Sequence, residues 1–158
     1  MLLGSFQSAS CPSFPTQFEY IVVFYKGSAR LQGSGESTVS KSDFIEWSNS
    51  LWRFSGASKL GTSVAYSSWC AGGVDSHPAP FPLELPLRCI HMLSYRGAVV
   101  YDPFMGSGTT ALAAVLSDRQ WFGSELSESY CRLAEYRLIE LQLEHPELGL
   151  DVGSIIRT

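Results

Sequence analysis

The sequence predicts an α/β fold, in which the strands of one sheet run parallel and helices pack on the sheet. Residues 77–142 alternate between helical and strand patterns, and a glycine-rich turn joins the first strand to the next helix. Strands that are separated by helices are joined by crossovers, so they run parallel. The length of 158 residues suits one domain with one core.

The region 77–145 contains three predicted helices and two predicted strands, each with the residue spacing of its type. An extended, proline-rich segment at 77–82 precedes them. In chain order they are a helix with Leu83, Leu87 and Ile90 on one face, a strand at 98–102, a helix at 109–116, a strand at 120–125, and a helix that Ser127 caps and His145-Pro146 ends.

The first half of the chain is less regular. Residues 19–25 are β-branched and aromatic and predict a buried strand that ends in a turn. Ser42 and Asp43 can cap a helix that runs to about Phe54, whose apolar stripe is expected to lie in the core. That stripe comprises Phe44, Trp47, Leu51 and Phe54. The predicted division is an irregular leader at 1–17, a segment with a strand and a helix at 18–76, an α/β region at 77–145, and an uninformative tail at 146–158.

Composition excludes several classes of protein. Hydrophobic residues make up 45% of the chain, which is enough for a folded core. No apolar run reaches the roughly 18 residues that a membrane span needs, and no signal peptide is apparent, so a cytoplasmic protein is expected. The four cysteines have no metal-ligand spacing.

The net charge of −4 is unevenly distributed. Residues 1–70 carry five Lys/Arg and four Asp/Glu, a balance of +1, whereas residues 71–158 carry six Arg and eleven Asp/Glu, a balance of −5. If the protein contacts a nucleic acid, the first half of the chain is therefore the better candidate for the contact.

The strongest signal is the segment 102–110, which reads DPFMGSGTT between a predicted strand and a predicted helix. In an α/β sheet, ligands bind at this end of the strands. Gly106 and Gly108 allow a ligand to approach the backbone, and the first N–H groups of the helix attract an anionic group such as a carboxylate. Asp102 can accept a hydrogen bond from an ammonium group.

Glu125 completes the predicted site at the end of the next strand. It follows Gly108 by 17 residues, close to the ~20-residue spacing at which an acidic side chain binds ribose hydroxyls. A turn for an amino-acid end and a carboxylate for a ribose describe a site for an adenosyl amino acid.

Three other interpretations compete for this segment. A phosphate-binding P-loop needs Lys where this chain has Thr109. A dinucleotide fingerprint needs a third Gly or Ala, for which Ala111 could serve, so that alternative stays open. The glycines could also merely shape a turn, but the strand–turn–helix–strand–Glu order argues against this.

These motifs resemble the DNA methyltransferases that methylate exocyclic amines, adenine N6 or cytosine N4. The resemblance rests on residues 102–110, 122–137 and 77–86, and less sharply on residues 18–26 and 44–54. It implies a class I methyltransferase-like (Rossmann-like) sheet that is incomplete, S-adenosylmethionine as cofactor, and double-stranded DNA as substrate. It also implies that the segment 18–76 contains the target-recognition part. The implied cofactor-binding residues are His77, Pro78, Phe81, Asp102, Phe104, Gly106, Gly108, Thr109 and Glu125, and the DNA-contact candidates are Lys26, Arg30, Trp52 and Arg53.

The catalytic motif of that family is missing from this sequence. The motif is an acidic residue, Asn or Ser, followed by Pro-Pro and an aromatic residue, and it accepts hydrogen bonds from the target amine of a flipped base. The chain contains no adjacent prolines. It therefore resembles a split subunit, a degenerate remnant or a truncated frame, and methyl transfer would need a second chain. A non-catalytic S-adenosylmethionine-binding subunit and a small-molecule methyltransferase are the alternatives, and an oligomer is plausible.

Overall fold

The computed structural model describes residues 19–27, 35–54, 81–148 and 155–157. The chain divides into two compact units, residues 1–31 and residues 32–158. The second unit contains every helix and strand that the described residues form.

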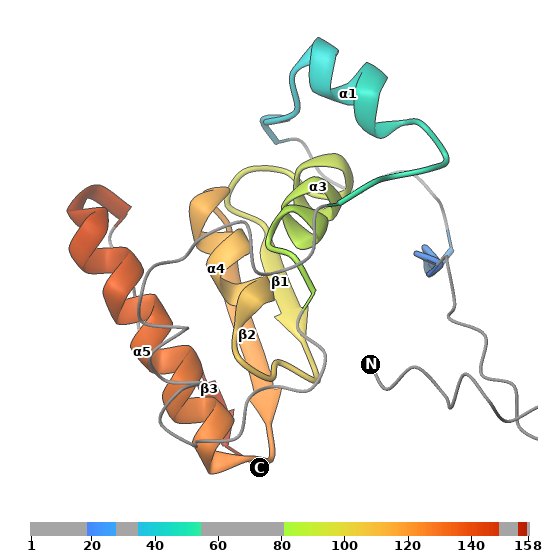
Figure 1. Cartoon of the computed structure of the whole chain (residues 1–158). Coiled ribbons are helices and arrows are strands. Elements are labelled where there is room, and N and C mark those ends of the chain that lie inside the picture. Colours follow the sequence, from blue (N-terminus) through green and yellow to red (C-terminus); the bar gives the residue numbers. More distant parts are fainter. Residues whose placement is uncertain (1–18, 28–34, 55–80, 149–154, 158) are drawn as a thin grey trace, which may run out of the picture. The chain divides into compact units, whose positions relative to one another are not determined.

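The second unit is built on a parallel sheet, as the sequence predicted (Figure 1). Its order is β1-β2-β3, with β1 at Val99–Asp102, β2 at Gln120–Glu125 and β3 at Ile155–Arg157. Asp102 lies opposite Gly123 in the register, so the ends of β1 and β2 are adjacent. The tail, for whose structure the sequence made no prediction, contributes β3 and the short helix η1 at Pro146–Leu148. Three-residue elements are too short to show a periodic pattern.

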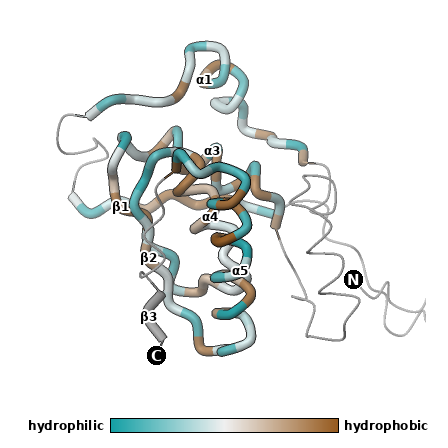
Figure 2. The backbone as a smooth tube through the Cα atoms, turned by 90° about the vertical axis from the view of Figure 1, so that its left-hand side faces the viewer, coloured by the Kyte–Doolittle hydropathy of each residue, from teal (hydrophilic) through white to brown (hydrophobic). Residues whose placement is uncertain are grey.

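The helices α3, α4 and α5 lie on one side of the sheet, as the two perpendicular views agree (Figures 1 and 2). They span Glu84–Leu93, Thr109–Leu116 and Glu128–Glu144. The predicted bounds of α4 and β2 and the Ser127 cap of α5 are confirmed.

Helix α4 forms the centre of the core and is strongly hydrophobic along its length (Figure 2). Five of its eight residues are buried apolar side chains, and three of these are alanines. Small side chains allow α3, α5 and the strands to approach α4 closely. Trp121 from β2 and Leu138 from α5 complete the packing around it.

The opposite face of the sheet is exposed. Val99 and Tyr101 on β1 each retain 56% of their accessible surface, and Phe122 on β2 retains 42%. These side chains alternate with Val100 and Trp121, which face the helices. Parallel sheets are normally covered on both faces, so the described residues provide only one of the two layers.

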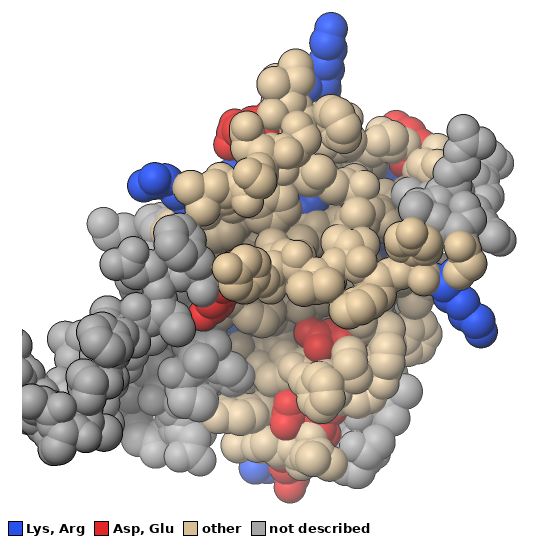
Figure 3. All heavy atoms as spheres, turned by 90° about the vertical axis from the view of Figure 1, so that its right-hand side faces the viewer, with Lys and Arg blue, Asp and Glu red and all other residues tan. Residues whose placement is uncertain are grey.

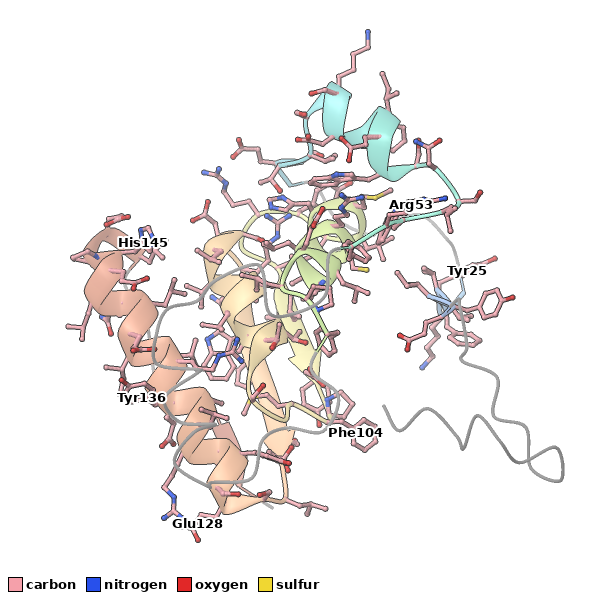
Figure 4. All side chains as sticks on the ribbon, in the orientation of Figure 1. Tyr25, Arg53, Phe104, Glu128, Tyr136 and His145 are labelled. Atoms are coloured by element: carbon pink, nitrogen blue, oxygen red, sulfur yellow. The ribbon has the colours of Figure 1, made fainter. Side chains whose placement is uncertain are left out.

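The predicted strand at 19–25 is wrong for the described residues. Residues 20–25 form no strand and are exposed, and Tyr25 and its neighbours project outward from their own backbone (Figure 4). The β-branched and aromatic composition expresses a preference for a pleated, half-buried surface. A strand also needs a neighbour with which its N–H and C=O groups pair, and the described part of the first unit, residues 19–27, contains no second strand.

The predicted helix at 42–54 is shorter than expected. Helix α1 spans Lys41–Trp47, and Ser40 rather than Ser42 caps it, by accepting a hydrogen bond from the Asp43 N–H at 3.0 Å. The helix ends where the side chains of Ser48 and Asn49 donate to backbone carbonyls of the last turn. Helix α1 has no buried residue, so the predicted core stripe is also wrong.

Part of that stripe instead surrounds a buried cation on α3. The guanidinium of Arg88 lies 5.6, 5.5 and 5.2 Å from the ring centroids of Trp47, Trp52 and Phe54. Arg88 also pairs with Glu84 in its own helix and, at 3.4 Å, with Glu46. Cation–π contacts and ion pairs therefore attach the segment 46–54 to α3.

A second buried arginine attaches the segment before α1. Arg119, only 4% exposed, donates to the Ser94 carbonyl at 2.7 Å and to the Thr38 hydroxyl at 2.8 Å. It also donates to the carbonyl of Ser117. Arg119 thereby joins residue 38 to the ends of α3 and α4.

We expect Arg119→Met to lower the free energy of unfolding by about 2–4 kcal/mol, because each buried acceptor left unsatisfied costs about 1–3 kcal/mol. Urea unfolding would measure the change. Arg96→Met is the matched control, since Arg96 is half exposed and its ion pairs with Glu36 and Asp118 are at the surface. Equal effects of the two substitutions would contradict the prediction.

Stability is expected to fall as pH decreases, because of His91. Burial, reinforced by the charge of Arg119, lowers the pKa of His91 below its ordinary value of 6.5. Its Nδ1 lies 2.6 Å from the Thr38 hydroxyl, which already accepts from Arg119. Between pH 6.5 and the lower pKa of His91 in the folded chain, His91 is protonated in the unfolded chain and neutral in the folded chain. The free energy of unfolding therefore decreases as the pH falls through this range.

His91→Gln should remove this part of the pH dependence. We expect the urea midpoint of the wild type to fall more than that of the variant when the pH is lowered from about 7.5 to about 5.5. Parallel curves for the two proteins would show that His91 does not carry the effect.

Candidate functional site

The candidate site is the turn from β1 into α4, residues 103–108. Its two glycines take positive φ angles, 54° at Gly106 and 79° at Gly108, where side chains are strained. Gly108 is the N-cap of α4, and the first N–H groups of a helix lack partners within the helix. The turn therefore brings backbone donors to the carboxyl end of the sheet.

Glu125, the last residue of β2, is hydrogen-bonded to this turn. One oxygen of its carboxylate accepts from the Gly106 N–H at 2.8 Å, and the other accepts from the Ser127 N–H at 2.8 Å. The side chain thus lies between the turn and the start of α5. Each carboxylate oxygen retains a further lone pair with which it could accept a ligand hydroxyl.

Asp102 lies at the corresponding position on β1. Its Oδ1 accepts from the Phe104 N–H at 3.0 Å, which shapes the first part of the turn. The Phe104 ring is 88% exposed and points away from the fold (Figure 4). An exposed aromatic ring in the turn that follows Asp102 offers a stacking surface for a planar group.

Close packing holds the turn from below. Met105 is buried, its N–H donates to the Ser124 carbonyl at 3.0 Å, and its side chain covers Gly123. A Cβ at Gly123 would lie 2.2 Å from the Met105 sulfur. The absence of a side chain at Gly123 therefore makes room for the turn.

Helix α5 contacts the same turn through two residues one helical turn apart. A Cβ at Gly108 would lie 2.8 Å from the Cβ of Ala134. Arg137 donates to the Ser107 carbonyl at 2.6 Å, to the Ser107 hydroxyl at 3.1 Å and to the Thr109 hydroxyl at 3.2 Å. The contribution of Arg137 to the turn was not predicted; the three-residue spacing from Ala134 was the available signal.

The structure thus brings five predicted cofactor residues to one edge of the sheet: Asp102, Gly106, Gly108, Thr109 and Glu125. The arrangement can accept hydroxyl or ammonium donors at its carboxylates and receive a carboxylate at the N-terminus of α4. Among the described ranges, no group of three or more His, Cys, Asp or Glu could hold a metal ion.

Other predicted site residues are not among the five at this edge of the sheet. His77, Pro78 and Arg30 are outside the described residues. Phe81 precedes α3 and is 42% exposed, so its predicted packing against a cofactor stays a prediction. The same holds for the DNA-contact candidates Lys26, Trp52 and Arg53.

Two of these candidates differ in how well they could reach DNA. Arg53 is exposed. Trp52 stacks beside Arg88, and its indole N–H donates to the Trp47 carbonyl at 2.7 Å. On the face drawn in Figure 3, Lys and Arg side chains stand apart from one another.

Comparison with known proteins agrees with this geometry. Residues 4–136 match the family model described as DNA methylase. The chain belongs to the DNA methylase family. Among curated relatives, it is 44% identical over 72 residues to the orphan methyltransferase M.BamHII of Bacillus amyloliquefaciens and 32% identical over 120 residues to the type II methyltransferase M.BglI of Bacillus subtilis.

The solved structures support the same fold. A Thermus thermophilus protein assigned as a DNA modification methylase, in complex with S-adenosyl-L-methionine, is 27% identical and aligns over 90% of this chain with a TM-score of 0.56. The parallel sheet with helices is therefore an incomplete form of the S-adenosylmethionine-dependent methyltransferase fold.

The match covers only part of each relative. The alignment with M.BamHII spans 46% of this chain and 27% of that relative, and the alignment with M.BglI spans 75% of this chain and 30% of that relative. The alignment with the Thermus protein covers 54% of that protein.

Among the described residues, no helix is both long and apolar enough to cross a membrane.

Proposed function

We propose that this chain is the S-adenosylmethionine-binding part of a DNA methyltransferase that modifies adenine N6 or cytosine N4. The observation that carries the proposal is the hydrogen bond between the Glu125 carboxylate and the Gly106 N–H at the ends of two adjacent parallel strands. It brings an acceptor for ribose hydroxyls next to a helix N-terminus suited to a carboxylate.

In this proposal the cofactor lies across the carboxyl ends of β1 and β2. Glu125 accepts from the ribose hydroxyls, the turn and the first N–H groups of α4 receive the methionine carboxylate, and Asp102 accepts from the methionine ammonium group. Phe104 and Phe81 pack beside the cofactor. S-adenosylmethionine supplies the methyl group, and the residues named here bind and orient it.

Methyl transfer itself needs a motif that this sequence lacks. No adjacent prolines occur in these 158 residues, so the acceptor for the target amine would come from residues outside this sequence. The same observation favours a second candidate function, a non-catalytic subunit that binds the cofactor and transfers nothing.

The exposed side of the sheet supports a partner chain. Val99, Tyr101 and Phe122 form an apolar row on the face opposite the helices, and β1 is an edge strand among the described residues. Unpaired strand edges and uncovered parallel sheets favour association with another chain. In a complete enzyme, Lys26, Arg30 and Arg53 would contact the phosphates of double-stranded DNA.

A methyl-transfer assay distinguishes these candidates. The purified chain is incubated with tritiated S-adenosylmethionine and unmethylated plasmid DNA, alone and together with any polypeptide encoded upstream that carries the Pro-Pro-aromatic motif. We expect no labelled DNA from the chain alone, and labelled N6-methyladenine or N4-methylcytosine from the pair.

Either half of that expectation can fail. Labelled DNA from the chain alone would show that the catalytic group is present after all. Cofactor binding without transfer in any combination would favour the non-catalytic subunit, and transfer to a metabolite would indicate a small-molecule enzyme.

A further inference from the structure

Arg137 on α5 makes three contacts with the turn that follows β1. Its Nη1 lies 2.6 Å from the Ser107 carbonyl, 3.1 Å from the Ser107 hydroxyl and 3.2 Å from the Thr109 hydroxyl. Ser107 and Thr109 are both buried. A guanidinium is a rigid, permanently charged donor, so it fixes acceptors more firmly than a neutral donor does.

These contacts determine the orientation of the peptide between Ser107 and Gly108. The Ser107 carbonyl accepts from Arg137, and the Gly108 N–H on the other side of that peptide donates to the Met105 carbonyl at 3.0 Å. Gly108 has a φ of 79°, and Ala134 lies directly against it. The peptide is therefore held at both ends, and its carbonyl is directed toward α5.

The orientation of this carbonyl matters for an anionic ligand. A carbonyl oxygen directed at a bound carboxylate would repel it, whereas the N–H groups at the start of α4 attract it. By binding the Ser107 carbonyl and the Thr109 hydroxyl, Arg137 directs these two acceptors toward α5. The cation also adds positive charge beneath the turn.

We propose that Arg137 is a positioning residue for the amino-acid end of the cofactor, acting through the Ser107 carbonyl and the Thr109 hydroxyl. It holds the turn in its binding conformation before the ligand arrives. The inference rests on the proposed S-adenosylmethionine site but assigns to it a residue on a different element, α5.

The test compares ligands with and without the amino-acid end. S-adenosylmethionine and 5′-methylthioadenosine, which lacks that end, are titrated calorimetrically into the wild type, Arg137→Met and Arg137→Lys. Arg132→Met is the matched control, because Arg132 lies on the same helix and pairs with Glu128 at the exposed surface.

We expect Arg137→Met to weaken S-adenosylmethionine binding by about tenfold, the loss of about one charge-assisted hydrogen bond. Binding of methylthioadenosine should change less than twofold. Arg137→Lys should recover part of the affinity, and Arg132→Met should behave as the wild type. A general loss of structure would weaken both ligands alike and would overturn the inference, as would unchanged binding of both.

Amide hydrogen exchange in the ligand-free chain provides a second readout. Arg137→Met should speed exchange at Gly108 by roughly tenfold, and Arg132→Met should leave it unchanged. If the wild type bound neither ligand, the proposed function would fail on its own. In that case faster exchange at Gly108 would still support the inference that Arg137 holds the turn in one conformation, and unchanged exchange would overturn it.

Discussion

Gly108→Ala is expected to destabilise the chain by about 2–5 kcal/mol and to weaken cofactor binding more than tenfold. A residue with a Cβ costs about 1–2 kcal/mol in the left-handed region, and the φ of Gly108 is 79°. The new Cβ would also lie 2.8 Å from that of Ala134, and crowding of a packed site costs about 1–3 kcal/mol. Urea unfolding and calorimetry would measure the two effects.

Gly97 provides the matched control. Its φ is 74°, but a Cβ there would meet nothing within 4 Å. Gly97→Ala should therefore show the backbone strain alone and leave binding unchanged. The double variant Gly108→Ala/Ala134→Gly should recover part of the crowding cost. Equal destabilisation by Gly97→Ala and Gly108→Ala would contradict the packing of α5 on the turn.

Glu125→Ala should weaken S-adenosylmethionine binding by roughly tenfold to a hundredfold, which corresponds to about 1.5–3 kcal/mol for a charged hydrogen-bonding group. The variant loses the acceptor for the ribose, and it also frees the Gly106 and Ser127 N–H groups that now donate to Glu125. A fall of about 1–2 kcal/mol in the free energy of unfolding is expected as well.

Two further variants separate binding from folding. Glu125→Gln keeps one oxygen acceptor and should bind with intermediate affinity. Glu128→Ala removes an exposed carboxylate three residues further along the chain, whose ion pair with Arg132 lies at the surface, and should leave the Kd within twofold. A Glu125→Ala protein that is folded and binds like the wild type would exclude Glu125 from the cofactor site.

The α/β region was predictable because its signals are local. The glycine-rich turn, the alanine-rich α4 and the Ser127 cap each specify an element through neighbouring residues, and the structure has them at the predicted positions. The adjacency of Asp102 and Glu125 follows from parallel strands whose ends meet at one edge.

The errors lie where tertiary contacts decide. Residues 20–25 have the composition of a strand, but the described part of their own unit contains no strand that could pair with them. Helix α1 ends at Trp47, and Trp52 and Phe54 beyond it surround Arg88 on α3. The role of Arg137 also depends on α5 lying against the turn, and the spacing of Arg137 from Ala134 indicates a shared helix face without showing what that face contacts.

The most direct test of the proposed cofactor site is a calorimetric titration of the purified wild-type chain with S-adenosylmethionine, and separately with NAD. We predict saturable binding of one S-adenosylmethionine per chain and none of NAD, because the proposed site pairs donors for a methionine carboxylate with a single acidic acceptor for a ribose. A folded chain that binds NAD in preference, or that produces no heat with S-adenosylmethionine, would contradict the assignment.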